Sequence, residues 1–162
     1  MVALCTAFEV NNHPAPMRIR RRAGQDLHER WGEDDATAYL GMTVPGFPNL
    51  FLMYGPNVNP GAGGSYMFLA ECQAHYIVDA LRQMRAQAIA TLECRSEVHD
   101  DYVRRVDEAH ARMVWSHPGM STYYRNAAGR VVTNTPWRIV DYWDMTRRAD
   151  LADFHAEPAQ AR

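Results

Sequence analysis

Residues 46–57 read GFPNLFLMYGPN, and this stretch decides the expected fold. Within it, residues 50–54 form an unbroken apolar run between Pro48 and Gly55-Pro56, which is typical of a strand buried on both faces. A glycine-rich segment, GAGG, follows at residues 61–64. From Ser65 to about residue 88 the apolar residues recur at helical spacing. The sequence therefore predicts a strand, a glycine-rich loop and a long helix.

The start of the predicted helix is the strongest candidate site in the chain. A helix start presents free backbone N–H groups and the positive end of the helix dipole, which stabilise nearby negative charge by about 0.3–2 kcal/mol. Glycines in front of the helix allow close approach of a ligand to the backbone. Ser65 itself is explained by helix capping. On these grounds alone, an ordinary glycine-rich turn is an equal alternative to a binding loop.

The composition indicates one globular core. The chain has 162 residues, 47% of them hydrophobic and 22% charged, and its net charge is -2, which shows no bias toward nucleic acid or membrane. It contains neither an apolar run of about 20 residues nor a secretory signal pattern, so a cytoplasmic protein is expected. Three cysteines at irregular spacing, Cys5, Cys72 and Cys94, predict reduced core thiols rather than disulfides or a zinc site.

Shorter elements are predicted on both sides of the central segment. We expect strands at residues 1–8, 36–40 and 90–94, and a single helical turn at 26–31. An amphipathic helix is expected from Ser96 to about residue 114, with a solvent-exposed charged face. Residues 122–126 and 127–132 predict two short strands around a glycine turn. The aromatic cluster of Trp137, Tyr142 and Trp143 is expected to seal a core, and the chain to fray from Arg147 onward.

Most familiar chemical motifs are missing from the sequence. Glu71 and Cys72 lie within one helical turn of His75, but no His-Glu-x-x-His or Cys-x-x-Cys motif supports a metal site. There is no Gly-x-Ser-x-Gly motif of a hydrolase and no Gly-x-Gly-x-x-Gly or Walker motif of a nucleotide fold. The arginine run at residues 18–22 predicts a solvated edge, with a phosphate-binding patch as the alternative.

Several segments together resemble the carboxyl-terminal part of class B flavoprotein monooxygenases, specifically Baeyer-Villiger monooxygenases of the 4-hydroxyacetophenone monooxygenase type. The resemblance rests on GFPNLFLMYGPN with the following GGS, and on AECQAHYIVDAL at residues 70–81. It extends to MVALCTAFEVN at 1–11, DLHERW at 26–31, AYLGMTVPGFPNLF at 38–51, STYYRNAAGRVV at 121–132 and PWRIVDYW at 136–143. Nearly the whole chain is therefore covered.

The resemblance implies a cofactor and a reaction. Such enzymes hold FAD and NADPH on two dinucleotide-binding folds and use O2 to insert oxygen into a ketone. By resemblance, the segment 55–67 lies against the isoalloxazine edge of the flavin, where the helix start favours the negative charge of the reduced ring. The residues expected to contact the cofactor are Gly55, Asn57, Gly64, Ser65, Tyr66 and Met67. No catalytic residue and no metal ligand is expected in this chain.

The departures from the family pattern define what the chain is expected to be. Both Gly-x-Gly-x-x-Gly loops, the family fingerprint and the arginine expected beside the flavin are absent, and Ala7 replaces the glycine of the family's Ala-Thr-Gly-Phe junction. These absences predict about the last quarter of such an enzyme, as a truncated gene product, a split subunit or a gene-model fragment. We expect it to be inactive alone and to self-associate through unpaired strand edges.

The expected fold class is α/β. Residues 1–95 are predicted to form the carboxyl-terminal portion of an FAD-binding dinucleotide-type domain, consisting of strand, glycine-rich loop and long helix. Residues 96–162 are predicted to form a small α+β extension. Two alternatives remain open at this point: a non-catalytic interaction module or subunit that completes a separate flavoprotein chain, and a fragment with no stable fold.

Overall fold

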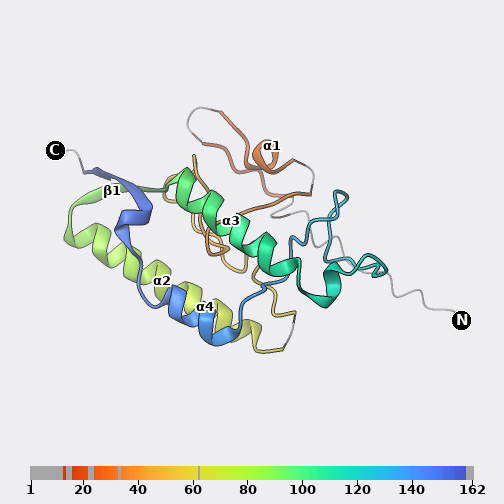
Figure 1. Ribbon diagram of the computed structural model, residues 1–162. Coiled ribbons are helices and arrows are strands. Elements are labelled where there is room, and N and C mark those ends of the chain that lie inside the picture. The colour runs from red at the N-terminus through yellow and green to blue at the C-terminus, as the bar shows by residue number, and fades with distance from the viewer. Residues whose placement is uncertain (1–12, 14–15, 22–23, 33, 62, 160–162) are drawn as a thin grey trace, which may run out of the picture.

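The computed structural model describes residues 13, 16–21, 24–32, 34–61 and 63–159 (Figure 1). The strand predicted at residues 1–8 and Cys5 lie outside these residues. In chain order the elements are α1 (Leu27–Trp31), α2 (Tyr66–Ala86), β1 (Ile89–Cys94), α3 (Ser96–His110), the 3-10 turn η1 (Val114–Ser116), α4 (Ile139–Thr146), the 3-10 turn η2 (Leu151–Asp153) and β2 (Phe154–Pro158). Irregular segments connect them and form much of the interior.

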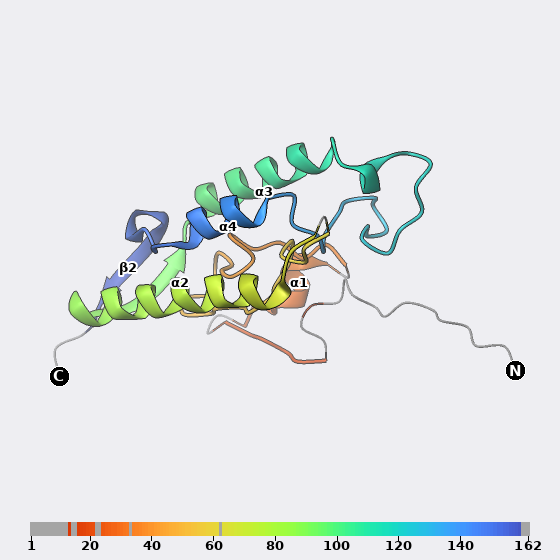
Figure 2. The ribbon, with the colours of Figure 1, turned by 90° about the horizontal axis from the view of Figure 1, so that it is seen from below.

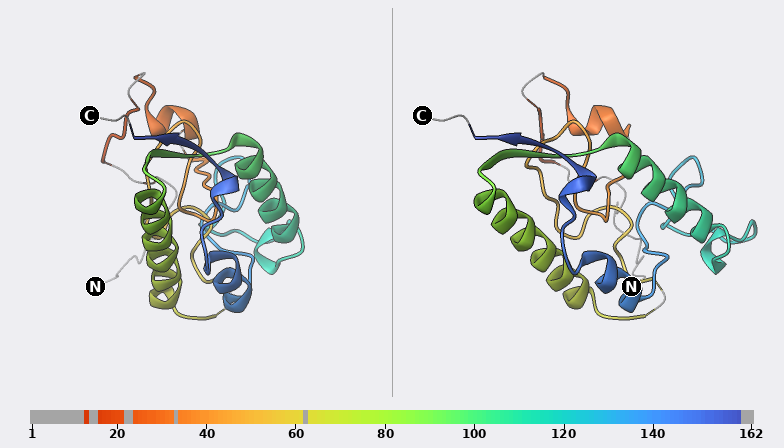
Figure 3. Two further views of the ribbon diagram at one scale, coloured as in Figure 1. Left: turned by 90° about the vertical axis from the view of Figure 1, so that its left-hand side faces the viewer. Right: turned by 60° about the vertical axis from the view of Figure 1, so that its left-hand side comes forward.

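The long helix predicted from Ser65 is confirmed as α2. Its buried residues recur along one face, which packs on α4 and β1: Leu69, Cys72, Gln73, Tyr76, Ala80 and Met84. Figure 3 shows α2 and α3 on opposite sides of the molecule, with the loops that precede α2 between them. In Figure 2, α4 lies between these two helices and runs beside α2. The start of α2 is therefore held at the edge of a packed interior.

The strand predicted at residues 90–94 is confirmed as β1, but its partner was not predicted. β2 pairs with β1 in antiparallel orientation, with Cys94 opposite Phe154. The prediction of a frayed end from Arg147 is therefore wrong. Because β2 reads FHAEP and exposes every residue except Phe154, its composition carries little strand signal. The buried Phe154 ring and the pairing with β1 supply the stabilisation that the local sequence lacks.

Two other predicted strands are wrong. Residues 50–54 form no strand; Tyr54 has φ 54° and Asn49 φ 59°, so left-handed backbone interrupts the extended run at both ends. The segment is half-buried rather than buried on both faces, and Met53 is exposed. Residues 36–40 likewise end in a tight turn, where Leu40 has φ 51° and only an isolated bridge joins Tyr39 to Thr43.

The remaining helix predictions are confirmed with shorter bounds. Asp26 caps α1 in a capping box with Glu29. α3 ends at His110, four residues before the predicted end. The two strands predicted at 122–126 and 127–132 are reduced to one antiparallel bridge, between Arg125 and Val131, around a turn closed by hydrogen bonds. These segments fold back on themselves without building a sheet.

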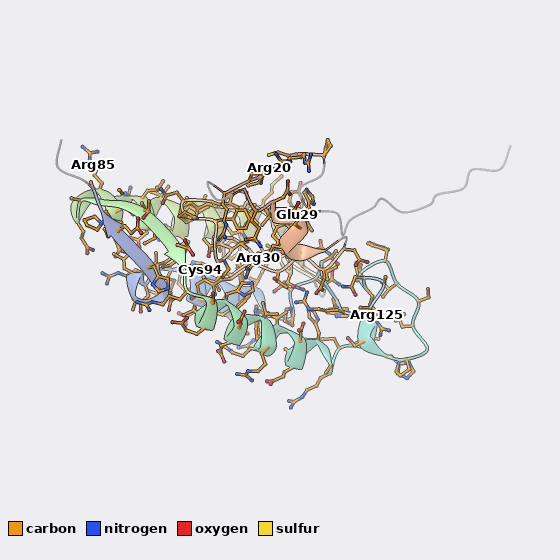
Figure 4. All side chains as sticks on the ribbon, turned by 90° about the horizontal axis from the view of Figure 1, so that it is seen from above. Arg20, Glu29, Arg30, Arg85, Cys94 and Arg125 are labelled. Atoms are coloured by element: carbon orange, nitrogen blue, oxygen red, sulfur yellow. The ribbon has the colours of Figure 1, made fainter. Side chains whose placement is uncertain are left out.

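The main hydrophobic cluster joins both halves of the chain. It includes Leu40, Tyr76 and Leu92 from the first 95 residues and Tyr102, Val106 and Phe154 from the rest. Of the aromatic cluster, Tyr142 is fully buried and its hydroxyl donates to the carbonyl oxygen of Leu40 at 2.7 Å, Trp137 is half-buried, and Trp143 is exposed. Cys72 and Cys94 are free, buried thiols, as predicted. Figure 4 shows Cys94 where β1 meets α3.

The described arginines of the basic run lie on the molecular surface. Arg18 and Arg20 are exposed, and both lie 3.4 Å from a carboxylate oxygen of Asp26. Their charge is therefore partly balanced within the chain. No helix in the described part of the chain is long and apolar enough to cross a membrane.

Candidate functional site

The segment before α2 is held by backbone pairing with residues 131–135. The amide of Asn57 donates to the carbonyl oxygen of Val132, and the amide of Asn59 to that of Thr133, both at 3.0 Å. In return, the amide of Thr135 donates to the carbonyl oxygen of Asn59 at 2.8 Å. The pairing is parallel and joins segments about 75 residues apart in sequence. The carboxyl-terminal half of the chain thus fixes the path of the candidate loop.

Two of the predicted site residues lie inside this loop rather than on its surface. Asn57 is buried and has φ 57°; its side-chain amide donates to the carbonyl oxygens of Val131 at 2.8 Å and Asn134 at 3.1 Å. Gly55 is also buried, and a Cβ atom there would collide with the carbonyl oxygen of Gly41. Both residues shape the loop, and the side chain of Asn57 has its donors directed into the protein.

The other four predicted residues are brought together at the exposed start of α2. The hydroxyl of Ser65 accepts a hydrogen bond of 3.4 Å from the amide of Phe68, which confirms Ser65 as the helix cap. Gly64 has φ 117°, a conformation that favours glycine. The side chains of Tyr66 and Met67 are 57% and 61% exposed. This end of the helix therefore faces outward.

The electrostatics of this helix start favour an electron-rich ligand. The first turn of α2 contains no acidic residue. Within the described residues, the amides of Tyr66 and Met67 have no hydrogen-bond acceptor. The dipole of a 21-residue helix is thus not neutralised by a carboxylate in its first turn. The arrangement can stabilise negative charge placed against residues 64–67.

A pocket of about 360 Å³ opens beside the loop, between it and the segment around residue 124. Its lining residues are His13, Tyr54, Gly55, Asn59, Tyr123, Tyr124 and Thr133. The hydroxyl of Tyr54 donates to Asn59 Oδ1 at 2.9 Å, and the rings of Tyr123 and Tyr124 lie 4.5 Å apart. Apart from Gly55, sequence reasoning missed these residues. The Tyr123-Tyr124 pair is the local signal, but only the folded chain places it opposite Tyr54.

A buried neutral histidine, His110, contacts the segment that pairs with the loop. The indole N–H of Trp115 donates to Nδ1 of His110 at 3.0 Å, so the ring proton of His110 is on Nε2, which donates to the carbonyl oxygen of Asn134 at 3.0 Å. Burial lowers the pKa of His110 to about 4. The imidazole is therefore uncharged at neutral pH and links α3 by a hydrogen bond to Asn134, in the segment that pairs with the loop.

Cys72 and His75, which lie within one helical turn of each other, have surroundings unrelated to metal binding. His75 Nε2 lies 3.0 Å from the carbonyl oxygen of Arg147, and burial raises the pKa of the Cys72 thiol. In the part of the chain that the structure describes, no three His, Cys, Asp or Glu side chains are arranged to hold a metal ion.

Known proteins similar to this chain are monooxygenases. The chain is 40% identical over 158 residues to an uncharacterized monooxygenase, y4iD, of Sinorhizobium fredii, covering 98% of this chain and 24% of the relative. It is 35% identical over 160 residues to a Baeyer-Villiger monooxygenase of Streptomyces coelicolor, covering 97% of this chain and 30% of that protein. The chain therefore spans about a quarter to a third of the length of these curated relatives. No protein-family model matches it.

Solved structures show the same fold. An oxidized steroid monooxygenase bound to NADP superimposes with a TM-score of 0.71 at 22% identity, over 85% of this chain and 26% of that one. A cyclohexanone monooxygenase in its closed form gives a TM-score of 0.71 at 20% identity, over 88% of this chain and 27% of the other. The fold of the described residues is thus similar to about a quarter of each of these two monooxygenase structures.

Proposed function

Since the chain is homologous over nearly its whole length to part of the Baeyer-Villiger and FAD-binding monooxygenases, we propose that it supplies the carboxyl-terminal part of a flavin-dependent monooxygenase acting on ketones. The main support for the proposal is the extent of the alignment. Of this chain, 97–98% aligns with relatives that are three to four times longer. We propose that residues 1–95 complete the flavin domain and that residues 96–162 form its extension.

The residues present fit one edge of a flavin and not the rest of FAD. Gly64, Ser65, Tyr66 and Met67 are exposed at a helix start without a nearby acid, which suits the electron-rich edge of a reduced isoalloxazine ring. Gly55 and Asn57 are assigned to the same site because they set the path of the loop. The sequence has no glycine motif for the pyrophosphate, so we expect weak or no FAD binding by the chain alone.

The protein's own contribution in this proposal is positional. When bound, FAD supplies the redox chemistry with NADPH and O2. The helix start stabilises charge on the ring, and the pairing of residues 57–59 with residues 132–135 keeps that helix start in place. No side chain in this site is assigned a proton-transfer role.

An experiment on a chimera tests the proposal. The matching quarter of the Sinorhizobium relative is replaced by this chain, which is 40% identical to it. The purified chimera is expected to retain one FAD and to oxidise NADPH in a ketone-dependent manner, whereas the isolated chain is expected to be colourless. A folded chimera without FAD, or a stoichiometric yellow protein from the isolated chain, would contradict the proposal.

The second candidate is a non-catalytic module that completes a separate flavoprotein chain. The exposed apolar residues of α2, including Val78 and Leu81, favour this candidate, because exposed apolar side chains that lie together are typical of surfaces that bind another protein. The same chimera distinguishes the two functions. FAD retention with ketone-dependent turnover supports the enzyme part, and FAD retention without any turnover supports the module.

A further inference from the structure

α2 carries a second apolar stripe on the side that faces away from the core. We define the α2 stripe as Met67, Ala70, Ala74, Val78 and Leu81. The spacings of three and four residues place all five side chains on one face of the helix. Met67, Val78 and Leu81 are 61%, 44% and 50% exposed, and Ala74 is also exposed. At 1.5 Å per residue the stripe is about 21 Å long.

The opposite side of α2 is already buried. Leu69, Tyr76 and Ala80 lie in the hydrophobic clusters described above. A helix that is apolar on most of its circumference is typical of helices covered on two sides. The described chain covers one side. The exposed polar residues beside the stripe or beyond its end suit solvent: Glu71, His75, Arg82 and Arg85.

We propose that the α2 stripe is the docking surface for the amino-terminal, dinucleotide-binding part of the monooxygenase, and not for a second copy of this chain. The inference rests on the proposed function and names the partner of its site. The Sinorhizobium relative carries about three quarters of its length outside the region matched by this chain. The stripe begins at Met67, directly beside the candidate flavin edge, so one partner can cover the stripe and complete the flavin site.

The composition of the stripe suits this occupant. Its middle positions, Ala70 and Ala74, have small side chains that let another element approach the helix closely, and larger side chains at both ends offer apolar contacts. The stripe itself contains no charge, as is usual for the central part of a stable interface.

Thiol labelling of Ala74→Cys measures whether the stripe is covered. The variant is prepared in the isolated chain and in the chimera, and maleimide labelling is followed site by site by peptide mass spectrometry. We expect Cys at position 74 to react at least about tenfold more slowly in the chimera than in the isolated chain. Ala111→Cys, at the exposed end of α3, is the matched control and should react equally in both. The native thiols of Cys72 and Cys94 are buried and report folding.

Each other outcome overturns the proposal. Equal labelling at position 74 in both proteins would mean that the stripe stays exposed. Protection in the isolated chain that disappears on dilution would identify a second copy as the occupant. Reaction of Cys72 and Cys94 in the chimera but not in the isolated chain would mean that the amino-terminal part unfolds this chain instead of covering the stripe.

A second variant gives an independent readout. Val78→Asp is expected to lower the melting temperature of the chimera by several degrees and to leave the isolated chain unchanged, because Val78 is 44% exposed there. Equal effects in both proteins would contradict the docking surface. FAD content separates the two hypotheses. Protection of the cysteine at position 74 in a chimera without FAD would support the docking surface and contradict the proposed function. FAD retention without this protection would support the proposed function and contradict the docking surface.

Discussion

Nδ2 of Asn59 donates a hydrogen bond of 2.7 Å to Oδ1 of Asn134, although 75 residues separate them. Asn59 also accepts, through Oδ1, a hydrogen bond from the hydroxyl of Tyr54. The loop that leads to α2 is therefore tied both to the pocket wall and to the carboxyl-terminal segment. Since most of these groups are buried or partly buried, removing one partner leaves polar atoms without a hydrogen bond.

Replacing Asn57 by alanine is expected to destabilise the chain by about 2–4 kcal/mol. The change removes two buried hydrogen bonds and places alanine at φ 57°, where a side chain other than Asn or Gly is strained. Urea unfolding followed by circular dichroism measures the difference. Asn49→Ala is the matched control, because Asn49 has φ 59° and also makes two side-chain hydrogen bonds, but is exposed. Equal losses would show that burial of Asn57 is unimportant.

The stability of the chain is expected to fall as the pH decreases from about 6.5 to about 4. Burial lowers the pKa of His110 to about 4, so in this window the unfolded chain binds a proton that the folded chain does not. The contribution of His110 is on the order of 3 kcal/mol. Burial also lowers the pKa of His99, which acts in the same direction. Urea midpoints across this range test the expectation.

His110→Gln identifies the group responsible. Glutamine does not titrate, so the pH dependence of the variant should be flatter than that of the parent chain, even if the variant is less stable at neutral pH. His155→Gln, on the exposed strand β2, is the control for the substitution of a histidine by glutamine itself. A variant with the parental slope would rule out His110 as the source.

Phe154→Ala is expected to cost about 3–5 kcal/mol, the usual range for a buried phenylalanine. The ring is 2% exposed and packs edge-on against Tyr39, with a centroid distance of 6.4 Å. Its loss should also release β2 from β1, which hydrogen exchange of the β1 amides would detect. His155→Ala, one residue later and exposed, should change stability by less than about 0.5 kcal/mol. Comparable losses would mean that β2 is held by pairing alone.

The sequence predicted the elements whose local signals agree with their packing. α2 has a serine cap and a sustained helical period and was predicted near its observed bounds. The helical turn predicted at residues 26–31 is also found, and a capping box stabilises it locally. Residues 50–54 failed because an apolar run reports burial, not backbone conformation. The left-handed residues Asn49 and Tyr54 are set by long-range hydrogen bonds, for example from the amide of Tyr54 to Gln73 Oε1 at 2.7 Å. Such long-range contacts cannot be inferred from the residues that are adjacent in the sequence.

Only part of the candidate site was predicted, because only part of it depends on local sequence signals. The exposed helix start at Ser65 follows from capping and glycine chemistry, which are local. The inward direction of the Asn57 side chain depends on residues 131–134, and the pocket depends on Tyr54 facing Tyr123 and Tyr124. Self-association was expected from the unpaired edges of two predicted strands, at residues 1–8 and 50–54. The second of these reasons no longer holds, because residues 50–54 form no strand.

Gly64→Val is expected to weaken FAD retention by the chimera about 5- to 30-fold, which corresponds to about 1–2 kcal/mol. Gly64 has φ 117°, a conformation that strains valine, and a Cβ atom there would collide with the side chain of Ile139. We therefore expect valine to disturb the backbone at the start of α2, where the flavin edge is proposed to lie. FAD content after gel filtration and fluorescence titration measure the effect.

The control must carry the same backbone strain without touching the site. Arg105→Ala, on the exposed face of α3, does not serve, because it carries no backbone strain and removes the contact of the Arg105 guanidinium with the Trp137 ring, 5.7 Å from the ring centre. Gly129→Val does: Gly129 has φ 84°, and a Cβ atom there meets nothing within 4 Å. Both variants should lose some stability, but only Gly64→Val should lose FAD. If both retained FAD equally, the segment 64–67 would be a structural turn, and the flavin edge would have to lie against other residues.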